Sequence, residues 1–377
     1  MRKLPIGIQT FEDIRKGDYL YVDKTAFVYQ IAQTGKPYFL SRPRRFGKSL
    51  LISTFEAYFQ GRKDLFQGLA IDKLEKEWIQ YPVLHLDLNA ENYKDADALR
   101  IILSRHLNLW EDAWGREERE ITVSDRFSGV IRRAYEQTGK QVVVLIDEYD
   151  KPLIQALLDE KLLDEYRRIL KGFYGVLKSA DRYLRFVFLT GVIKFLGDSL
   201  LDAEMNQFND ISLDYDYNAL CGFTEDEINK IFPFEIENRC NSFQLSKTSM
   251  FDKLAKRCGG YHFCRLLEDV YNPILVLKVF AENNIDDYCC QDSEELLLLQ
   301  NLSKRNVNFL NIMGQDIPVP SFAFTCCCIG KDNLLSLFYS LGYQTIKSYD
   351  KEYSLYTLNF PNIEMRRLFE KAILRIC

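Results

Sequence analysis

The stretch SRPRRFGKSL (41–50) carries the signature of a phosphate-binding loop. It ends in Gly-Lys-Ser (47–49), which matches the end of the pattern G-x-x-x-x-G-K-[ST]. The first glycine of that pattern permits a tight turn, but this chain has Arg42 there, followed by Pro43. Proline fixes its own φ and pushes the preceding residue towards an extended conformation, so we expect the chain to enter the loop along a different path.

The sequence on either side of the loop supports this interpretation. The apolar run PYFL (37–40) predicts a short strand, and KSLLISTFEAYFQG (48–61) has apolar residues at helical spacing. A strand, a loop and a helix in this order point backbone N–H groups and the positive end of the helix dipole at an anion. We therefore expect Lys48 to reach the β- and γ-phosphates of ATP and the Ser49 hydroxyl to bind Mg²⁺.

A second candidate element lies about a hundred residues downstream, in QVVVLIDEYD (141–150). Its aliphatic run is typical of a strand buried on both faces of a parallel sheet. Asp147, at the end of the run, is expected to support Mg²⁺, and Glu148 to activate the attacking water as a general base. The alternative is two solvated acids at a strand end, but the loop upstream favours the catalytic interpretation.

Thr190 closes another buried strand, RFVFLTG (185–191). We expect its hydroxyl to bind the attacking water or the γ-phosphate; alternatively it only caps the strand. Three arginines in the loop add positive charge beside the site. They either contact phosphate or a partner, or they pair with neighbouring acids or face solvent. These arginines are Arg42, Arg44 and Arg45.

The order of the predicted elements indicates an α/β domain followed by a mostly helical region. Strand and helix patterns alternate over about the first two hundred residues, which predicts a parallel sheet flanked by helices. Thr224 and Glu227 then form a capping-box signature at the start of a helix. We expect a P-loop ATPase core over residues 1–220 and a helical lid with a winged-helix-like domain over residues 221–377.

The winged-helix expectation comes from the last part of the chain. A helix over 333–342, capped by Asp332 and stopped by Gly342, precedes a hairpin over 343–360. A final helix follows over 363–376. The basic residues of this helix and of the hairpin suggest nucleic-acid contact, although Glu364 and Glu370 in the helix make an ordinary solvated surface the alternative. The basic residues concerned are Lys347, Lys351, Arg366, Arg367, Lys371 and Arg375.

Composition narrows the class of protein. The net charge of -5 gives no overall attraction to nucleic acid or anionic membranes. No apolar run approaches the ~20 residues of a membrane span, and the N-terminus has no signal-peptide core. All ten cysteines lie at or beyond Cys221, some of them adjacent in sequence, as in 289–290 and 326–328. We expect reduced thiols and a cytoplasmic protein without a zinc site.

Seven segments together resemble the predicted AAA-ATPase-like proteins common in gut bacteria. The resemblance covers nearly the whole chain, and the loop is its most specific part because it replaces the usual glycine in the same way. The segments are YVDKT (21–25), RPRRFGKSL (42–50), LIDEYDKPL (145–153), FLTGV (188–192), LCGFTEDEI (220–228), YNP (271–273), and LGYQTI with PNIE (341–346, 361–364).

The resemblance implies a P-loop ATPase core with an extra strand between the two phosphate-sensing motifs. It also implies that YVDKT (21–25) lies near the adenine of ATP, where the alternative is an ordinary strand-to-helix turn, and that Pro273 contacts the base from the lid. The candidate ATP-binding residues are Tyr21, Val22, Asp23, Lys24, Arg44, Arg45, Phe46, Gly47, Lys48, Ser49, Leu50 and Pro273.

The chain departs from the family pattern at two places. His262, in GGYHF (259–263), stands where an arginine is usual, and a neutral histidine would sense phosphate less well. Family members usually continue into a PD-(D/E)XK nuclease domain, whereas this sequence ends at Cys377. We expect no nuclease activity from it.

Two functions remain open. The first is a Mg²⁺-dependent ATPase whose hydrolysis acts as a conformational switch that regulates a nuclease or a nucleic-acid-related partner. The second is an ATP-binding regulatory or scaffold module that does not hydrolyse. Glu148 favours the first and His262 the second.

Overall fold

The computed structural model divides the chain into two compact units. It describes residues 2–35, 37–90, 92–195, 207–282, 316–324 and 334–374. The unit that we call the sheet unit comprises Asp23–Ser41 and Ser49–Ile211. The C-terminal unit comprises Met1–Val22, Arg42–Lys48 and Ser212–Cys377. The phosphate loop is therefore grouped with the C-terminal part of the chain, while the predicted domain boundary at residue 220 stays a prediction.

The sheet unit is built on a parallel sheet with the strand order β2-β3-β4-β1-β5. Strand β4 lies between β1 and β3, which is the inserted strand that the family resemblance implies. Every residue of β3 is buried, as its uninterrupted aliphatic run predicts. The strands are β1 (Pro37–Ser41), β2 (Val83–Asp87), β3 (Val142–Asp147), β4 (Leu184–Gly191) and β5 (Asn209–Asp210).

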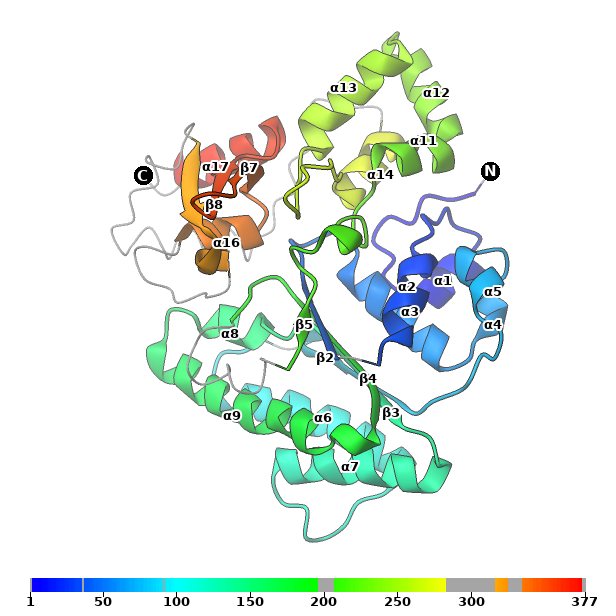
Figure 1. Ribbon diagram of the computed structural model, residues 1–377, viewed down its shortest axis with the longest axis vertical. Helices are drawn as coiled ribbons and strands as arrows, with labels where there is room; N and C mark the ends of the chain where they lie inside the picture. Colours follow the sequence, from blue (N-terminus) through cyan, green and yellow to red (C-terminus); the bar gives the residue numbers. More distant parts are fainter. Residues whose placement is uncertain are drawn as a thin grey trace. The chain divides into compact units, whose positions relative to one another are not determined.

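Helices cover both faces of this sheet, which confirms the predicted α/β class. Figure 1 shows α2 and α3 on one face and α6, α7 and α9 on the other. On the α3 face, Phe55 packs against Phe188 of β4 with ring centroids 4.8 Å apart. The helices are α2 (Thr25–Gln33), α3 (Lys48–Phe59), α4 (Lys63–Phe66), α5 (Ala70–Leu74), α6 (Ala96–Trp114), α7 (Val123–Thr138), α8 (Lys151–Ala156) and α9 (Glu160–Ser179), with short 3-10 turns at Leu88–Ala90 and Asp181–Tyr183.

Helix α7 is absent from the sequence prediction, although a local signal marks its start. Thr122 accepts a hydrogen bond from the Asp125 N–H, and Asp125 accepts one from the Thr122 N–H. This is a capping box with aspartate in the place of glutamate. At the other end, Gly139 adopts a left-handed conformation and terminates the helix.

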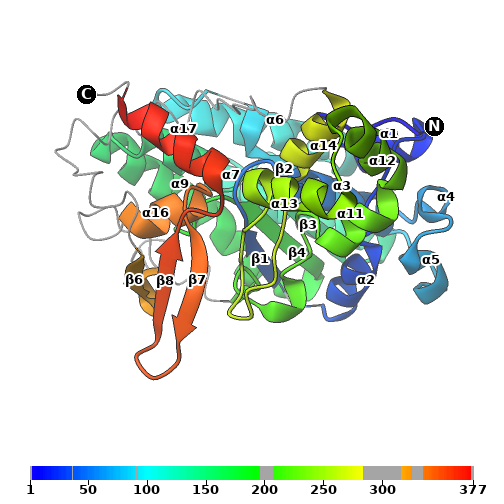
Figure 2. The ribbon, with the colours of Figure 1, turned by 90° about the horizontal axis from the view of Figure 1, so that it is seen from above.

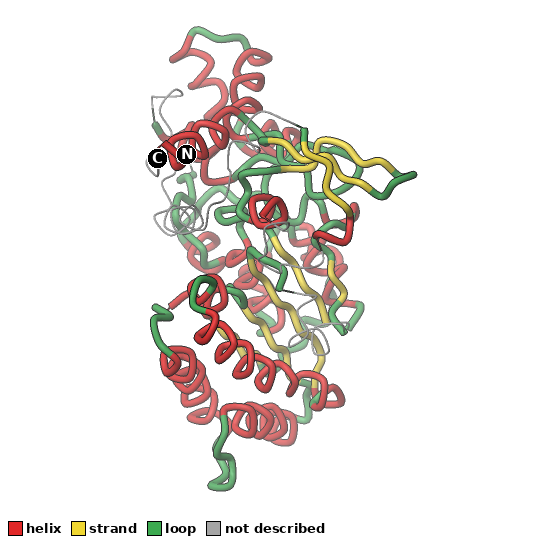
Figure 3. Tube along the Cα trace, turned by 90° about the vertical axis from the view of Figure 1, so that its left-hand side faces the viewer, coloured by secondary structure: helices red, strands yellow, loops and turns green. Residues whose placement is uncertain are grey.

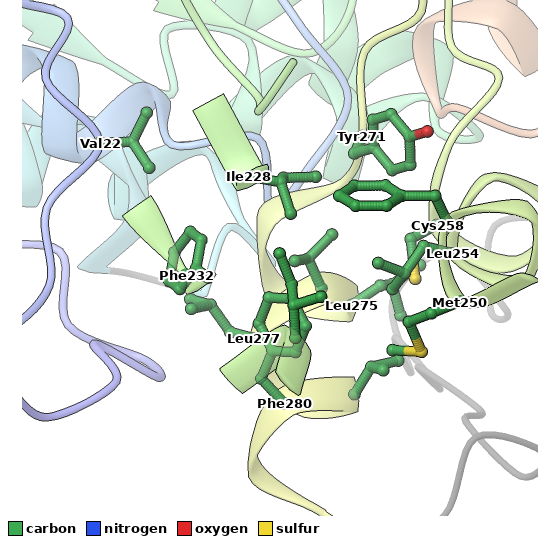
Figure 4. Packing of buried hydrophobic residues seen from close by; sticks show 14 residues of the cluster. Val22, Ile228, Phe232, Met250, Leu254, Cys258, Tyr271, Leu275, Leu277 and Phe280 are labelled. Carbon is green, nitrogen blue, oxygen red and sulfur yellow. The ribbon is translucent and has the colours of Figure 1, made fainter. Parts of the chain in front are cut away.

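The C-terminal unit contains a helical core that includes a residue from the N-terminus. Thr224 and Glu227 form the predicted capping box of α11. Figure 4 shows the apolar side chains of this core, among them Val22, Ile228, Leu254 and Leu275. The helices are α1 (Phe11–Lys16), α11 (Glu225–Ile231), α12 (Pro233–Phe243), α13 (Lys247–Cys258) and α14 (Pro273–Ala281), with a 3-10 turn at Tyr215–Tyr217.

A second, antiparallel sheet lies near the end of the chain. The predicted hairpin is formed by β7 (Thr345–Asp350) and β8 (Leu355–Asn359), seen clearly in Figure 2. Strand β6 (Ile317–Pro320), which was not predicted, pairs with β8, and Figure 3 shows these strands in yellow.

The hairpin has a helix before it and a helix after it, in the predicted order. These are α16 (Leu334–Ser340), preceded by a 3-10 turn at Ser321–Phe324, and α17 (Ile363–Leu374). Phe338 of α16 packs edge-on against Phe369 of α17, with ring centroids 5.3 Å apart. Asp332 lies outside the described residues, and the winged-helix likeness stays a prediction.

Two findings concern membrane-spanning helices and the state of the cysteines. Over the described residues, no helix combines the length and the apolar composition that crossing a bilayer requires. The cysteines in the described part are free thiols: Cys221, Cys240, Cys258 and Cys264. The adjacent cysteines at 289–290 and 326–328 lie outside that part.

Candidate nucleotide-binding site

Asp147 and Thr190 come from neighbouring strands that end at one edge of the parallel sheet, and Glu148 directly follows Asp147. In the strand register, Leu40 of β1 lies beside Thr190 of β4, and Asp87 of β2 lies beside Asp147 of β3. Because the strands are parallel, their carboxyl ends share this edge. Strand β1 ends there at Ser41, and α3 begins after the loop, at Lys48.

Asp147 and Thr190 are in direct contact. The Thr190 hydroxyl donates a hydrogen bond of 2.5 Å to Oδ1 of Asp147, and both side chains are buried. The Glu148 N–H donates to the same oxygen at 3.0 Å. Since the hydroxyl hydrogen is bound to Asp147, Thr190 retains only acceptor capacity on its oxygen.

Glu148 has a strained backbone. Its φ is 53°, in the left-handed region that residues with a Cβ seldom adopt. The carbonyl oxygen of Glu148 accepts from the Lys151 N–H at 3.0 Å, and the next residue, Tyr149, donates its N–H to the Thr190 carbonyl at 3.0 Å. Strained residues of this kind persist only where the surrounding structure maintains them, and they cluster at functional sites.

The phosphate loop curls around its own lysine. Lys48 is only 3% exposed and donates from Nζ to the carbonyl oxygens of Arg42, at 3.1 Å, and Pro43, at 3.3 Å. Gly47 has φ 95°, and apart from its own atoms and those of its two neighbours in the chain, no heavy atom of the described residues lies within 4 Å of the point where a Cβ on it would be. A glycine with a left-handed backbone beside open space, at the start of a helix, fits a phosphate group.

Arg42 has a structural role that the sequence did not reveal. It is 1% exposed and donates to the carbonyl oxygens of Ser212, at 2.7 Å, and Tyr217, at 3.1 Å. Its guanidinium carbon lies 4.3 Å from the ring centroid of Phe263. Buried carbonyl groups require such donors, so Arg42 fastens the loop to residues 212–217.

The other loop residues take different positions. Phe46 is buried, packs edge-on against Tyr261, and accepts a hydrogen bond on its carbonyl oxygen from the Gly222 N–H. Arg45 is exposed with φ 71°, and Arg44 is partly buried. Phe46 therefore acts with Arg42 as an anchor of the loop within the C-terminal unit.

The segment YVDKT (21–25) makes contacts that hold the chain in place. Oδ2 of Asp23 accepts from the Ala70 N–H at 2.7 Å, and the Thr25 hydroxyl oxygen accepts from the Ile71 N–H at 3.1 Å. These bonds tie the start of α2 to α5, as a structural turn would. Its proposed place beside adenine stays a prediction.

The remaining adenine candidates lie in similarly packed surroundings. Tyr21 packs edge-on against Phe11, Val22 is part of the C-terminal core, and Lys24 is buried. Pro273 is the first residue of α14, which Asn272 caps through hydrogen bonds to two backbone N–H groups. Ser49 and Leu50 lie in the first turn of α3 and are partly buried.

His262 is buried among hydrogen-bond acceptors. Its Nδ1 lies 2.6 Å from the carbonyl oxygen of Ile346 on β7, and its Nε2 lies 2.6 Å from Oδ1 of Asp269. Its backbone N–H donates to the Thr345 hydroxyl at 2.7 Å. Both ring nitrogens are therefore engaged inside the C-terminal unit.

Two residues of β2 were not identified as candidates from the sequence. Asp87 lies beside Asp147 in the register, and His85 pairs with Glu56 of α3, with 2.9 Å between Nδ1 and Oε2. Burial lowers the pKa of His85, but the Glu56 hydrogen bond and the charges of Glu56, Asp147 and Asp87 outweigh it and leave the pKa raised. The signal that could have identified this strand end as part of the site was the aspartate that closes the segment YPVLHLD (81–87).

Some of the basic residues proposed for nucleic-acid contact interact with groups close to them in the chain. Nε of Arg366 lies 2.9 Å from Oε1 of Glu370, and Nζ of Lys347 lies 3.4 Å from the Pro361 carbonyl oxygen. Arg367, Lys371 and Lys351 are exposed, and Arg375 lies outside the described residues. Nucleic-acid contact stays a prediction.

Comparisons with known proteins show what this chain is similar to. A family model described as "Predicted AAA-ATPase" matches residues 5–201. A protein of Azotobacter chroococcum mcd 1, "Uncharacterized protein in vnfD 5'region", is 34% identical over 379 residues, covering 99% of this chain and 70% of that protein. A solved structure, that of the Aeropyrum pernix ORC2 protein in ADPNP-ADP complexes, is 12% identical with a TM-score of 0.34, covering 94% of this chain and 92% of that one. The family-model match over more than half of the chain and the 34% identity together show that the chain belongs to the predicted AAA-ATPase family.

Proposed function

We propose that this chain is a Mg²⁺-dependent ATPase that uses hydrolysis to switch the arrangement of its C-terminal unit. Family membership supports nucleotide binding and hydrolysis in general. The observation that carries the specific proposal is Glu148, held at φ 53° directly after buried Asp147. A carboxylate kept on a strained backbone at the sheet edge where the phosphate loop starts is well explained by a catalytic role.

The proposal assigns a role to each candidate. Lys48 and the backbone N–H groups at the start of α3 bind the phosphates, with Arg44 and Arg45 as further cations on the loop. Ser49 and Asp147 hold Mg²⁺, which when bound neutralises charge on the phosphate oxygens. Glu148 orients the attacking water and accepts its proton.

The contact between Thr190 and Asp147 refines the role of Thr190. A γ-phosphate oxygen accepts hydrogen bonds, and the hydroxyl hydrogen of Thr190 is already given to Asp147. A water molecule can donate to the remaining lone pairs of the hydroxyl. Of the two roles expected from the sequence, contact with the attacking water therefore has the better support.

The anchoring of the phosphate loop supports a conformational switch. Arg42 and Phe46 attach the loop to residues 212–222, within the C-terminal unit. A ligand that contacts Gly47 and Lys48 therefore acts on a segment that belongs to the packing of this unit. Such a ligand shifts the equilibrium between two arrangements of the unit only to the extent that it binds one arrangement more tightly than the other.

One observation favours the second candidate, an ATP-binding module that does not hydrolyse. His262 replaces the expected arginine, and both of its ring nitrogens are engaged by Ile346 and Asp269. In this arrangement its ring has no donor left for a phosphate.

A single-turnover assay with radiolabelled ATP separates the two candidates. We expect Glu148→Gln to bind ATP but to hydrolyse it at least about 100-fold more slowly, because a general base contributes about that much. The exposed Glu77 provides a matched control, and Glu77→Gln should behave as the wild type. Tight binding without hydrolysis by the wild type would support the module instead. A Lys48→Ala protein that binds ATP as well as the wild type would contradict both.

A further inference from the structure

The two residues after Glu148 bind the segment that follows β4. The Tyr149 hydroxyl donates to the Ile193 carbonyl oxygen at 2.9 Å and accepts from the Phe195 N–H at 2.9 Å. Oδ2 of Asp150 accepts from the Val192 N–H at 2.9 Å and from the Ile193 N–H. Both side chains are completely buried.

The backbone on either side of Glu148 is held as well. Before it, Asp147 accepts the Thr190 hydroxyl, and after it, the Tyr149 N–H donates to the Thr190 carbonyl. Gly191 permits the close approach, since a Cβ there would lie 2.5 Å from both Oδ1 of Asp150 and the Tyr149 ring. The peptide that contains Glu148 is thus fixed at both ends by residues 190–195.

We infer that Tyr149 and Asp150 are positioning residues that keep Glu148 in its left-handed conformation and thereby set the position of its carboxylate. The strain at Glu148 requires a structure that over-determines it, and these four side-chain hydrogen bonds to residues 192–195 provide it. The catalytic part of this inference rests on the proposed hydrolytic role of Glu148.

Tyr149→Phe tests the inference with the smallest change. The ring keeps its edge-on contact with Phe39, at 5.3 Å between centroids, and only the bridging oxygen is lost. We expect kcat to fall about tenfold or more while the Kd for ATP stays within about twofold, because small displacements of a reacting group are costly. Asp150→Asn, which keeps the side-chain shape but weakens the acceptor, should act in the same direction and replaces Tyr149→Phe if that protein does not fold.

Tyr166→Phe is the matched control. It also removes a buried tyrosine hydroxyl that donates to a backbone carbonyl, that of Asp95, at 2.5 Å. We expect its kcat to equal that of the wild type when each protein is assayed at the same number of degrees below its own Tm. Equal losses of kcat in Tyr149→Phe and Tyr166→Phe would overturn the inference, since loss of a buried hydroxyl would then explain both.

A second measurement does not depend on activity. Glycine tolerates a left-handed backbone, so Glu148→Gly should relieve strain and raise the Tm of the wild type by roughly 2 °C. If Tyr149 maintains the strain, the same substitution should give less than about half of this gain in the Tyr149→Phe background and the full gain in the Tyr166→Phe background. An equal gain in all three backgrounds would overturn the inference.

The two proposals fail in distinguishable ways. Hydrolysis that survives Glu148→Gln contradicts the proposed function, while the Tm coupling between Glu148 and Tyr149 still tests whether the strain is maintained as inferred. A different result contradicts the positioning role alone. In that case Glu148→Gln loses hydrolysis, but Tyr149→Phe has the same kcat as Tyr166→Phe and gains the same Tm from Glu148→Gly.

Discussion

The Thr190 hydroxyl donates a hydrogen bond to Oδ1 of Asp147 across 2.5 Å and joins two neighbouring parallel strands at their carboxyl ends. Since the Glu148 N–H binds the same carboxylate oxygen, the contact links Thr190, Asp147 and Glu148 in one network. A buried carboxylate depends on such donors, because an unsatisfied charge is costly.

Replacing Thr190 with valine should destabilise the protein. Thr190→Val keeps the shape of the side chain but removes the donor to Asp147, so we expect the free energy of unfolding to fall by about 1.5–3 kcal/mol. Urea denaturation followed by circular dichroism measures it. Thr190→Ser keeps the hydroxyl and should lose less. If serine costs as much as valine, packing of the methyl group is responsible and not the hydrogen bond.

Alanine at position 47 should impair both stability and nucleotide binding. Gly47 has φ 95° and, beyond its two chain neighbours, no described residue near its Cβ position, so the cost of alanine comes from the backbone and not from a clash. We expect a loss of about 1 kcal/mol in stability and weaker ATP binding, measured by thermal unfolding and isothermal titration calorimetry.

Gly139→Ala is the matched control for this substitution. Gly139 also has a positive φ, 64°, and open space among the described residues, but it lies at the end of α7. It should show a similar loss of stability with unchanged ATP affinity. Equal losses of affinity in both variants would contradict a specific role for Gly47.

Removing the charge of Arg42 should be far more damaging than removing that of Arg45. Arg42→Met leaves the carbonyl groups of Ser212 and Tyr217 without their buried donor, which we expect to cost about 2–4 kcal/mol. Arg45 is exposed, and Arg45→Met should change stability by less than about 0.5 kcal/mol. Denaturant unfolding compares them, and similar values for the two variants would contradict the anchoring role.

His85 should make stability depend on pH. Its pKa in the folded protein is raised, so its protonation stabilises the fold fully below the unfolded pKa of about 6.5. That contribution disappears as the pH rises through the folded pKa. Between about pH 6 and pH 8, the Tm of the wild type should therefore fall more steeply than that of His85→Asn, as differential scanning fluorimetry would record.

His106 gives a control of opposite sign. Burial lowers its pKa despite its hydrogen bond to the Asp87 carbonyl, so its contribution is present at high pH and lost as the pH falls. His106→Asn should therefore make the decline of Tm with rising pH steeper. Identical pH profiles for the wild type and His85→Asn would contradict the predicted titration.

Much of the sheet unit was predictable because its signals are local. The aliphatic run before Asp147 is sufficient to indicate a buried strand, and the apolar spacing after Lys48 indicates a helix. Helix α7 was missed although Thr122 and Asp125 mark its start, because its capping box uses aspartate. Strand β6 is short and contains two prolines, which are unusual in strands, so pairing with β8 defines it.

The sequence by itself determined that a strand, a phosphate loop and a helix follow one another, and that acids and a threonine close two buried strands. Only the tertiary structure decided the partners of Arg42, which lie about 170 residues away at Ser212 and Tyr217. It likewise decided that Asp87 lies beside Asp147 and that Glu148 is strained. The physical reason is that backbone periodicity is encoded locally, whereas buried donors and acceptors find their partners through packing between distant segments.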